Sequence, residues 1–428
     1  MKNKKETLLI LTILITICII IFNRDKLYEA KYTEPKDTLL AITINGEIST
    51  TFPTTKYYET SVECTTGTGK VEWNGTKWVL TTNGITKGST KCNATFITKV
   101  PTFAETILAN NKVKAPITTP GATISTASEA LLASTEDDYG TSYYFRGAVT
   151  NNYVEFANKC WRIVRVGGDG SVKLILHNDN PTGAANPCDA ANNSASAAFA
   201  HYNGSTYTSR FNENYDDNAY IGFKYGTPGS SKYETTHANT NKSTILTNLE
   251  TWYTNTLKTY ESVIDDTVWC NDKTNVTDTS YDPWSITPNG LGYAKNVTYY
   301  GATKRLVGTS GSAGGTGPSL KCNGELSKIN SKVGLITADE LAFAGYAYNI
   351  GNTTTYLQEN ATNTYWWSLS PYGFDVGSAG VWGVNGSAGY FDNYNVRGTY
   401  GVRPLISLKS TTNVTGEGTS SAPYIISM

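Results

Sequence analysis

The pattern of apolar and polar positions divides the chain into an apolar N-terminal segment and a long remainder that resembles a series of short strands. Residues 7–22 read TLLILTILITICIIIF and follow Lys2, Lys4 and Lys5. From about Thr38 onward, apolar residues alternate with polar ones in short runs that end in Gly, Asn or Pro, which is typical of half-buried strands joined by turns. We therefore expect a β-rich chain of the α+β class with few helices.

The N-terminal segment predicts attachment to a membrane. Its 16 uncharged residues make it slightly shorter than a typical membrane span and slightly longer than the core of a signal peptide. No small-x-small cleavage site follows, because the next residues are Asn23, Arg24 and Asp25. We interpret residues 1–23 as an uncleaved single-pass anchor of the cell membrane and residues 24–37 as a polar tether, with the bulk of the chain extracellular. A signal peptide that is removed is the alternative, and it also implies export.

Residues 38–99 predict a small all-β domain. The dipeptide Asn74-Gly75 lies between two strand-like runs and indicates a hairpin, because both residues tolerate the positive φ of a type I′ turn. Cys64 and Cys92 flank this hairpin, so a disulfide between them would join the surrounding strands. The domain is loosely immunoglobulin-like, although its cysteines lie closer in sequence than those of an immunoglobulin domain. We expect it to act as a spacer.

The rest of the chain divides into three further segments. Residues 100–135 predict a linker with one short helix, since TFAETILANN is followed by a stretch rich in Thr, Pro and Ala. A large domain is expected over residues 136–410, and a polar C-terminal tail over residues 411–428.

The large domain opens with two predicted hairpins. Asn151-Asn152 is expected to turn the first, and the glycine-rich residues 167–170 the second. In the second hairpin, three apolar residues of one strand are expected to face three of the other in a register that the sequence leaves open, namely Trp161, Ile163 and Val166 against Val172, Leu174 and Leu176. Two arginines of the first of these strands, Arg162 and Arg165, are expected on its solvated face.

Two helices are predicted inside the large domain. The first has Ser243 as its N-cap and an apolar stripe formed by Ile245, Leu249, Trp252, Tyr253 and Leu257. The second carries a capping box of Thr337 and Glu340 and ends at Gly345. Their aromatic and carboxylate side chains are therefore expected to serve the core and the helix ends.

Charge and cysteine content narrow the class of protein. Charged residues make up 17% of the chain and the net charge is −1, so we expect no nucleic-acid partner. Six cysteines lie outside the apolar segment, and local pairing favours Cys64–Cys92, Cys160–Cys188 and Cys270–Cys322 in an oxidising exterior. Zinc ligation is the alternative, but it needs clustered spacing, and no C-x-x-C motif occurs.

Several motifs of the large domain resemble a known family. DDYGTSYYFRGAV, FANKCWRIVRVGGDGSVKLIL, VGLITADELAFAG, YWWSLSP and YGVRPLISL occur in this order between Asp137 and Leu408. Together they resemble a family of uncharacterised surface proteins of Gram-positive bacteria, known as a domain of unknown function, whose hallmark is a Trp-Trp pair before Ser-Pro and a final Gly-Val-Arg-Pro. Members commonly carry Arg within the Trp-Trp motif. This chain has Ser368 and Leu369 there instead.

The resemblance implies a C-type-lectin-like fold for the large domain, shared with formylglycine-generating enzymes. This is an analogy of fold, which implies no chemistry by itself. Formylglycine-generating enzymes depend on reactive cysteines in the C-terminal half, and this chain has no cysteine after Cys322. We therefore do not expect that activity. Arg403 of the Gly-Val-Arg-Pro motif is expected to be a buried donor to loop carbonyls.

The stretch from Tyr365 to Leu408 is rich in Trp, Tyr, Asn, Gly and Ser, which is the composition of binding loops. Aromatic faces and amides also suit sugar rings, whose C–H faces stack and whose hydroxyls need hydrogen-bond partners. A hairpin is indicated at Asn385-Gly386. We expect a displayed ligand-binding surface made of Trp367, Tyr372, Phe374, Trp382, Asn385, Tyr390, Asn393, Tyr394, Asn395, Arg397 and Tyr400. The alternative is a packed β meander in which these rings are core.

These observations favour a surface-anchored binding protein, an adhesin or lectin-like module that recognises a glycan or a protein. One alternative is a structural envelope protein without a specific ligand. A carbohydrate-active enzyme is a further alternative, since glycoside hydrolysis needs two carboxylates, and Asp216, Asp217, Glu340, Asp375 and Asp392 are available. We expect no catalytic residue, no cofactor and no identified metal site. Calcium stays possible through the acidic pairs of the loops, at Asp137-Asp138, Asn178-Asp179 and Asp216-Asp217.

Overall fold

The computed structural model describes residues 39–86 and 90–428, which form two compact units, one ending at Pro101 and one running from Thr102 to Met428. Strands make up 36% of the structure and helices 13%, so the expected β-rich fold is confirmed. Among the described residues, no helix is long and apolar enough to cross a membrane. The predicted anchor (1–23) and tether (24–37) lie outside the described residues.

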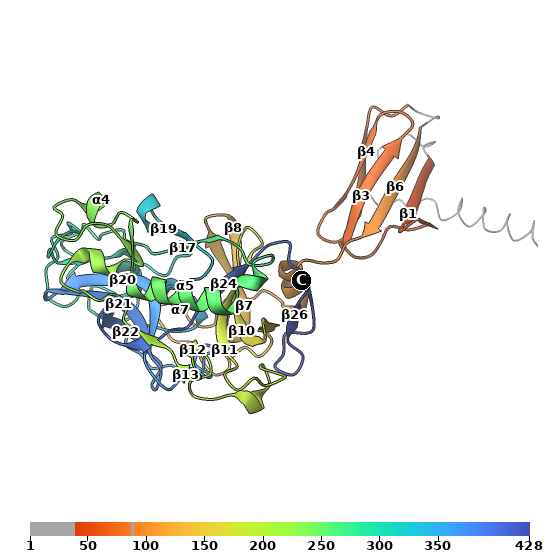
Figure 1. The fold of residues 1–428 in the computed structure, drawn as a ribbon. Helices are drawn as coiled ribbons and strands as arrows, with labels where there is room; N and C mark the ends of the chain where they lie inside the picture. The colour runs from red at the N-terminus through yellow and green to blue at the C-terminus, as the bar shows by residue number, and fades with distance from the viewer. Residues whose placement is uncertain (1–38, 87–89) are drawn as a thin grey trace, which may run out of the picture. The chain divides into compact units, whose positions relative to one another are not determined.

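The first unit contains two small sheets that share one core (Figure 1). Four strands pair in the order β2-β1-β6-β3, with β1 parallel to β6, while β4 and β5 form a separate hairpin. Trp78 of the hairpin packs on Phe96 of the larger sheet, with ring centroids 5.3 Å apart. The strands are β1 Leu39–Ile44, β2 Glu47–Ser49, β3 Tyr58–Cys64, β4 Thr68–Trp73, β5 Trp78–Asn83 and β6 Lys91–Thr98.

Two local features of this unit refine the predictions. The hairpin at Asn74-Gly75 is present, but its turn is not of type I′, since only Gly75 of this pair has a positive φ. The Asn74 side chain instead accepts hydrogen bonds from the backbone N–H groups of Thr76 and Lys77, at 3.1 and 2.9 Å. The predicted disulfide Cys64–Cys92 is confirmed, and it joins directly paired residues of one sheet. The disulfide of an immunoglobulin domain joins two sheets instead.

The second unit is built around two larger sheets. One has eight strands, with β24-β11-β10-β9-β26-β25 in a row and the hairpin of β7 and β8 attached to β10. Its strands are β7 Ala130–Asp137, β8 Gly140–Gly147, β9 Tyr153–Phe156, β10 Lys159–Val166, β11 Val172–Asn178, β24 Leu405–Leu408, β25 Val414–Thr415 and β26 Tyr424–Ile426.

The other sheet has six strands, β14-β23-β20-β21-β22 in a row and β18 beside β20. These are β14 Thr208–Ser209, β18 Thr298–Tyr299, β20 Trp366–Asp375, β21 Ser378–Asn385, β22 Tyr390–Asn395 and β23 Tyr400–Gly401. Three two-stranded ribbons complete the strands of this unit, β12 His201–Tyr202 with β13 Ser205–Thr206, β15 Lys224–Tyr225 with β16 Asn241–Lys242, and β17 Thr267–Cys270 with β19 Lys328–Ser331.

Helices connect the two sheets of the second unit. Helix α7 contacts both β8 of the eight-stranded sheet and β20 of the six-stranded sheet (Figure 1). The predicted capping box and C-terminal glycine explain the bounds of α7. Thr337 and Glu340 cap its start, and Gly345 ends it at φ +125°. The α-helices are α3 Phe103–Asn110, α4 Tyr233–Thr236, α5 Thr244–Thr256, α6 Gly301–Leu306 and α7 Ala338–Ala344, and the 3₁₀ helices are η1 Ala190–Asn192, η2 Asn218–Ile221, η3 Lys258–Tyr260 and η4 Glu325–Ser327.

The expected linker and tail are parts of the second unit. Helix α3 buries Phe103 against Tyr424, with ring centroids 5.2 Å apart, and β7 pairs along its whole length with β8. In the expected tail, β26 pairs with β9, which places Tyr424 opposite Val154. Both segments were predicted as separate from the domain, the first because it is rich in Thr, Pro and Ala, whereas a few buried rings hold them in place.

One predicted hairpin is confirmed and the other is wrong. Strands β10 and β11 pair as predicted, and the register, which the sequence left open, places Trp161 opposite Leu176. Strand β9, however, pairs with β10 through a turn at Ala157-Asn158, whose φ angles are 54° and 56°, and β8 pairs with β7 and β10. Asn152 lies in the connection between β8 and β9, where its side chain is fully buried.

Arg162 does not lie on a solvated face. It is fully buried, and its guanidinium donates to Asn152 Oδ1 at 2.6 Å and to the Val149 carbonyl at 2.6 Å. It also forms an ion pair with Glu359 at 2.9 Å. The eight-stranded sheet is covered on both faces here, so alternation along β10 does not separate core from solvent.

Candidate functional site

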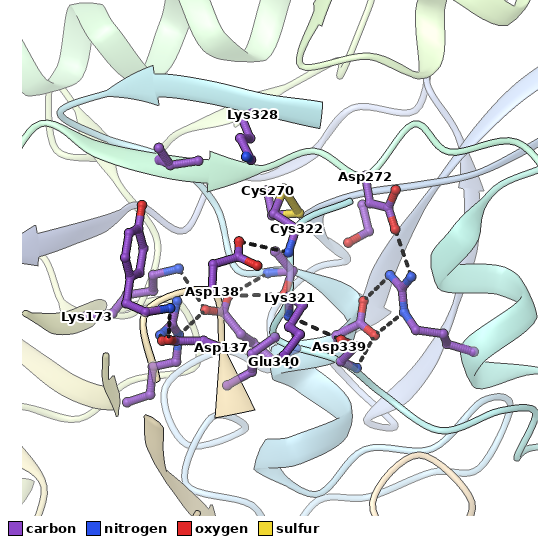
Figure 2. Close-up of a pocket in the computed structure, with 18 residues that line it drawn as sticks. Asp137, Asp138, Lys173, Cys270, Asp272, Lys321, Cys322, Lys328, Asp339 and Glu340 are labelled. Carbon is purple, nitrogen blue, oxygen red and sulfur yellow. Dashed lines mark hydrogen bonds and ion pairs between the residues drawn. A yellow bond between two sulfur atoms is a disulfide. The ribbon is translucent and has the colours of Figure 1, made fainter. Parts of the chain in front are cut away.

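A charged pocket lies where α7 meets the eight-stranded sheet (Figure 2). Its volume is about 250 Å³, and its walls come from the β7–β8 turn, β10, β11, β17, α6, α7 and residues 319–322. Acidic and basic side chains from these distant segments face one another across it. The sequence analysis missed this pocket, because no local motif links residues that the fold brings together from nine segments, β19 and β20 included.

Glu340 is the central carboxylate of the charged pocket. Its Oε1 accepts hydrogen bonds from Arg165 Nε at 3.0 Å and Lys173 Nζ at 2.7 Å, while Oε2 accepts one from the Thr337 backbone N–H at 3.0 Å. Burial raises the pKa of this carboxyl, but Lys173, Arg165 and these hydrogen bonds outweigh burial and lower the pKa to about 2. Glu340 therefore stays ionised and cannot serve as a general acid near neutral pH.

Arg305 forms the second ion-pair centre of the charged pocket. Its Nε and Nη2 donate to the two oxygens of Asp339 at 2.6 and 2.8 Å, and its Nη1 donates to Asp272 at 2.7 Å. Burial lowers the pKa of Arg305, but the two carboxylates outweigh burial and raise the pKa. The two parallel hydrogen bonds to Asp339 have the bidentate geometry that a planar guanidinium forms with a carboxylate. Arg305, Asp339 and Asp272 therefore neutralise one another, which indicates a mainly structural role for these three side chains.

Residues 319–322, which we call the strap, line one side of the charged pocket. The Ser319 N–H donates to Asp339 Oδ1 at 2.9 Å, and the Cys322 N–H donates to Asp138 Oδ2 at 3.0 Å. The disulfide Cys270–Cys322 joins the strap to β17, and Cys160–Cys188 forms as well, so all three predicted pairs are confirmed.

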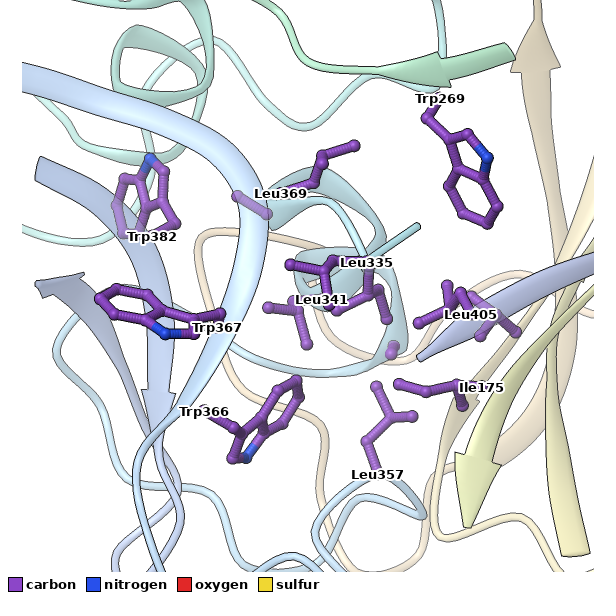
Figure 3. Packing of buried hydrophobic residues seen from close by; sticks show 14 of the residues in the cluster. Ile175, Trp269, Leu335, Leu341, Leu357, Trp366, Trp367, Leu369, Trp382 and Leu405 are labelled. Carbon is purple, nitrogen blue, oxygen red and sulfur yellow. The ribbon is translucent and has the colours of Figure 1, made fainter. Parts of the chain in front are cut away.

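The aromatic stretch does not form the open surface expected from the sequence. Trp367, Tyr372, Phe374 and Trp382 are all buried in the core of the second unit, and Figure 3 shows Trp367 and Trp382 among its apolar residues. Trp382 stacks on Phe391 with ring centroids 4.6 Å apart. The prediction that these four rings face a ligand is therefore wrong. The six-stranded sheet is covered on both faces here, so Trp366 and Trp367 are buried although they point to opposite sides.

Three tyrosines of this stretch, one at its start and two towards its end, remain partly exposed and lie together. The ring centroids are 5.1 Å apart for Tyr365–Tyr394, 5.2 Å for Tyr365–Tyr400 and 5.5 Å for Tyr394–Tyr400. Tyr365 is 38% exposed, and Tyr394 and Tyr400 are half-buried. We call these three residues the tyrosine cluster. Buried Trp367 supports it from below, 4.6 Å from the Tyr400 ring. The sequence analysis selected Tyr394 and Tyr400 but missed Tyr365.

A glycine on the neighbouring strand makes the tyrosine cluster possible. An added Cβ at Gly383 would lie 2.9 Å from the ring of Tyr394, so no larger residue fits beneath that ring without a shift. Gly383 pairs with Trp367 on one side and with Asp392 on the other.

The polar residues of the predicted surface mostly build turns. Asn385 accepts a hydrogen bond from the Ser387 N–H at 3.1 Å, and Asn395 accepts one from the Arg397 N–H at 2.9 Å. Asn393 donates to Asp392 at 3.2 Å, and exposed Arg397 lies over the Tyr215 ring at 4.8 Å. Tyr390, which is 42% exposed, lies across the hairpin from Asn385. The predicted hairpin at Asn385-Gly386 is confirmed, but its amides are largely occupied.

The other candidate carboxylates have separate roles. Asp216 pairs with Lys295 at 3.3 Å, and Asp217 caps η2 through the Ala219 N–H at 2.9 Å. Burial raises the pKa of both Asp375 and Asp392. In the described part of the chain, no group of three or more His, Cys, Asp or Glu residues is arranged to hold a metal.

Arg403 has the role predicted from its motif. It is fully buried and donates from Nε to the Leu176 carbonyl at 3.0 Å and from Nη1 to the Leu357 carbonyl. Its guanidinium also lies 5.0 Å from the ring of Trp366. The Gly-Val-Arg-Pro motif therefore ties the end of the six-stranded sheet to β11.

Comparison with known proteins adds no relative. No protein-family model matches the chain, and no curated protein or solved structure is detectably similar to it. The resemblance to Gram-positive surface proteins and the C-type-lectin-like fold therefore stay predictions from the sequence.

Proposed function

We propose that the chain is an extracellular binding protein, attached to the membrane by its N-terminal segment, that grips a glycan or protein ligand with the tyrosine cluster of its second unit. The observation that carries the proposal is the contact of three partly exposed tyrosine rings within 5.5 Å of one another. Rings that are already ordered by their neighbours lose little conformational entropy when a ligand binds.

Two further features support this proposal. Trp367 and Gly383 lie against the cluster on its core side, and such packing restricts the positions that its rings can take. The three disulfides agree with an exported protein, because such bonds persist in oxidising surroundings.

Binding by the full-length chain in detergent to arrays of glycans and host proteins tests this function. The native protein is compared with a Tyr365→Ala/Tyr394→Ala variant, and Tyr139→Ala is the control because Tyr139 is 61% exposed and belongs to the β7–β8 turn instead. We expect the double variant to lose at least ~tenfold in affinity, since aromatic contacts dominate such interfaces. Equal binding by all three proteins, or no binding by the native protein, would refute the proposal and leave the structural envelope role.

A further inference from the structure

A shallow pocket on the second unit places neutral polar groups beside two tyrosine rings. Its volume is about 270 Å³, and the ring centroids of Tyr220 and Tyr225 in its wall are 5.5 Å apart. The polar groups come from the segment before η2 and from the first turns of α5. We call it the amide pocket, defined by Asn212, Asn214, Tyr220, Tyr225, Thr244 and Asn248.

The charged residues at the rim of the amide pocket have partners elsewhere. Glu213 pairs with Arg210 at 2.7 Å, and Lys242 pairs with Glu250 at 2.5 Å. The Asn212 amide N–H also has a partner, the Tyr220 carbonyl at 2.8 Å. What remains for a ligand is therefore the Asn248 amide together with hydroxyls and rings, without net charge. This distinguishes the amide pocket from the charged pocket, whose acids and bases face inward.

Several polar atoms of the amide pocket are left open to a ligand. Asn248 donates its side-chain N–H to Ser209 Oγ at 2.9 Å and keeps its amide oxygen free. Within the residues that the structure describes, no hydrogen bond reaches the hydroxyl groups of Tyr225 or Thr244. A ligand that combines an apolar face with several hydroxyls can use both the rings and these groups, and a sugar ring has this chemistry.

The amide pocket adjoins the tyrosine cluster through shared backbone. Ser209, which holds Asn248, is paired with Tyr400 between β14 and β23. The N–H groups of Phe211 and Asn212 both donate to the Val396 carbonyl, at 2.9 and 3.1 Å. Residues 209–212 therefore connect the two places, which are neighbours on the second unit.

We infer that the amide pocket binds one neutral sugar ring of a glycan whose neighbouring residues lie on the tyrosine cluster. This inference rests on the proposed function, because it names the ligand class of the same surface. The Tyr225 ring would contact a C–H face of the sugar, while Asn248 Oδ1 and the Thr244 hydroxyl would bind its hydroxyls.

Saturation-transfer NMR with single monosaccharides tests the amide pocket directly. The probes are the methyl glycosides of glucose, galactose, mannose and N-acetylglucosamine, each at millimolar concentration with the full-length chain. We expect at least one of them to bind the native protein and the Tyr139→Ala control equally. Tyr225→Ala should weaken that binding at least ~tenfold. Absence of binding by every probe, or unchanged binding by Tyr225→Ala, overturns the inference.

A second variant covers the case in which Tyr225→Ala perturbs the fold, as judged by near-ultraviolet circular dichroism. Asn248→Ala removes an amide near the surface and should weaken the monosaccharide at least ~fivefold, while an unchanged affinity overturns the inference. The Tyr365→Ala/Tyr394→Ala variant should still bind the monosaccharide. If array binding depends on the tyrosine cluster but no monosaccharide binds the amide pocket, the inference fails and the proposed function stands.

Discussion

Replacing Glu340 by Gln should reveal how strongly the charged pocket holds the second unit together. The carboxyl is buried, and its pKa is lowered from 4.5 to about 2 by Lys173 and Arg165, whose charges outweigh burial. A shift of this size corresponds to roughly 3 kcal/mol of stability in the ionised form. Because the folded-state pKa is the lower one, this contribution is fully present above about pH 4.5 and is lost as the pH falls towards 2.

The variant should therefore be less stable than the native chain by about 3–5 kcal/mol at pH 7, since a buried ion pair loses one partner. The difference should shrink by roughly 3 kcal/mol between pH 5 and pH 2, because a protonated Glu340 resembles Gln. Urea denaturation followed by tryptophan fluorescence measures it, since only Trp73 and Trp78 lie in the first unit. Other carboxyl groups titrate in both proteins and cancel in the difference.

Glu250→Gln is the matched control for this experiment. Glu250 pairs with Lys242 on the surface, so its loss should change stability by less than about 0.5 kcal/mol at pH 7. A Glu340→Gln difference that stays constant from pH 7 to pH 2 would refute the reasoning, because it would show that the charge of Glu340 contributes nothing.

Two further changes test the core and the cross-links. Trp382→Ala should cost about 3–5 kcal/mol in denaturation, because the ring is fully buried, whereas Tyr390→Ala on the same hairpin should cost less than about 1 kcal/mol. Similar costs for both would contradict the assignment of Trp382 to the core. Replacing Cys270 and Cys322 together by Ser removes a cross-link over a separation of 52 residues, which should cost about 4 kcal/mol. An unchanged denaturation midpoint would count against that contribution.

Features that depend on near neighbours in sequence were predictable. The helix that begins after Ser243 and the capping box at Thr337 follow from side chains within one turn, and both are present. The disulfides were also predictable, because each one joins two cysteines that follow one another in the sequence. The pairing of β10 with β11 was also predictable from the glycine-rich turn between them, although its register was left open, and the structure places Ile163 opposite Leu174 with a register shift before Arg165.

Features that depend on distant packing were not predictable. The Thr-, Pro- and Ala-rich composition of residues 100–135 gave no sign that Phe103 packs on Tyr424 or that Glu129 forms a buried ion pair with Arg146, at 3.0 Å. Alternation identified strands but did not show that both faces of a sheet were covered, so Arg162 was predicted to be solvated. The charged pocket was missed for the same reason, since its residues come together only in the folded chain.

The composition of the aromatic stretch carries two signals that the sequence cannot separate. Tyr, Trp, Asn and Gly occur in binding loops, but they also suit a sheet that packs indole rings tightly against glycines. In this chain both uses meet at one place. Trp367 is buried against Phe211, with ring centroids 5.8 Å apart, and its other neighbour is the Tyr400 ring at 4.6 Å.

The packing of the core therefore sets the position of the surface rings. A change of Gly383 to Ala would place a methyl group 2.8 Å from the Trp366 carbonyl oxygen and 2.9 Å from the Tyr394 ring, so the neighbouring strand or the ring would have to move. If the tyrosine cluster binds a ligand, this substitution should weaken binding although residue 383 itself contacts none. Loss of binding without loss of fold in such a variant would separate a rigid recognition surface from a passive coat, because a coat has no need for the exact placement of these rings.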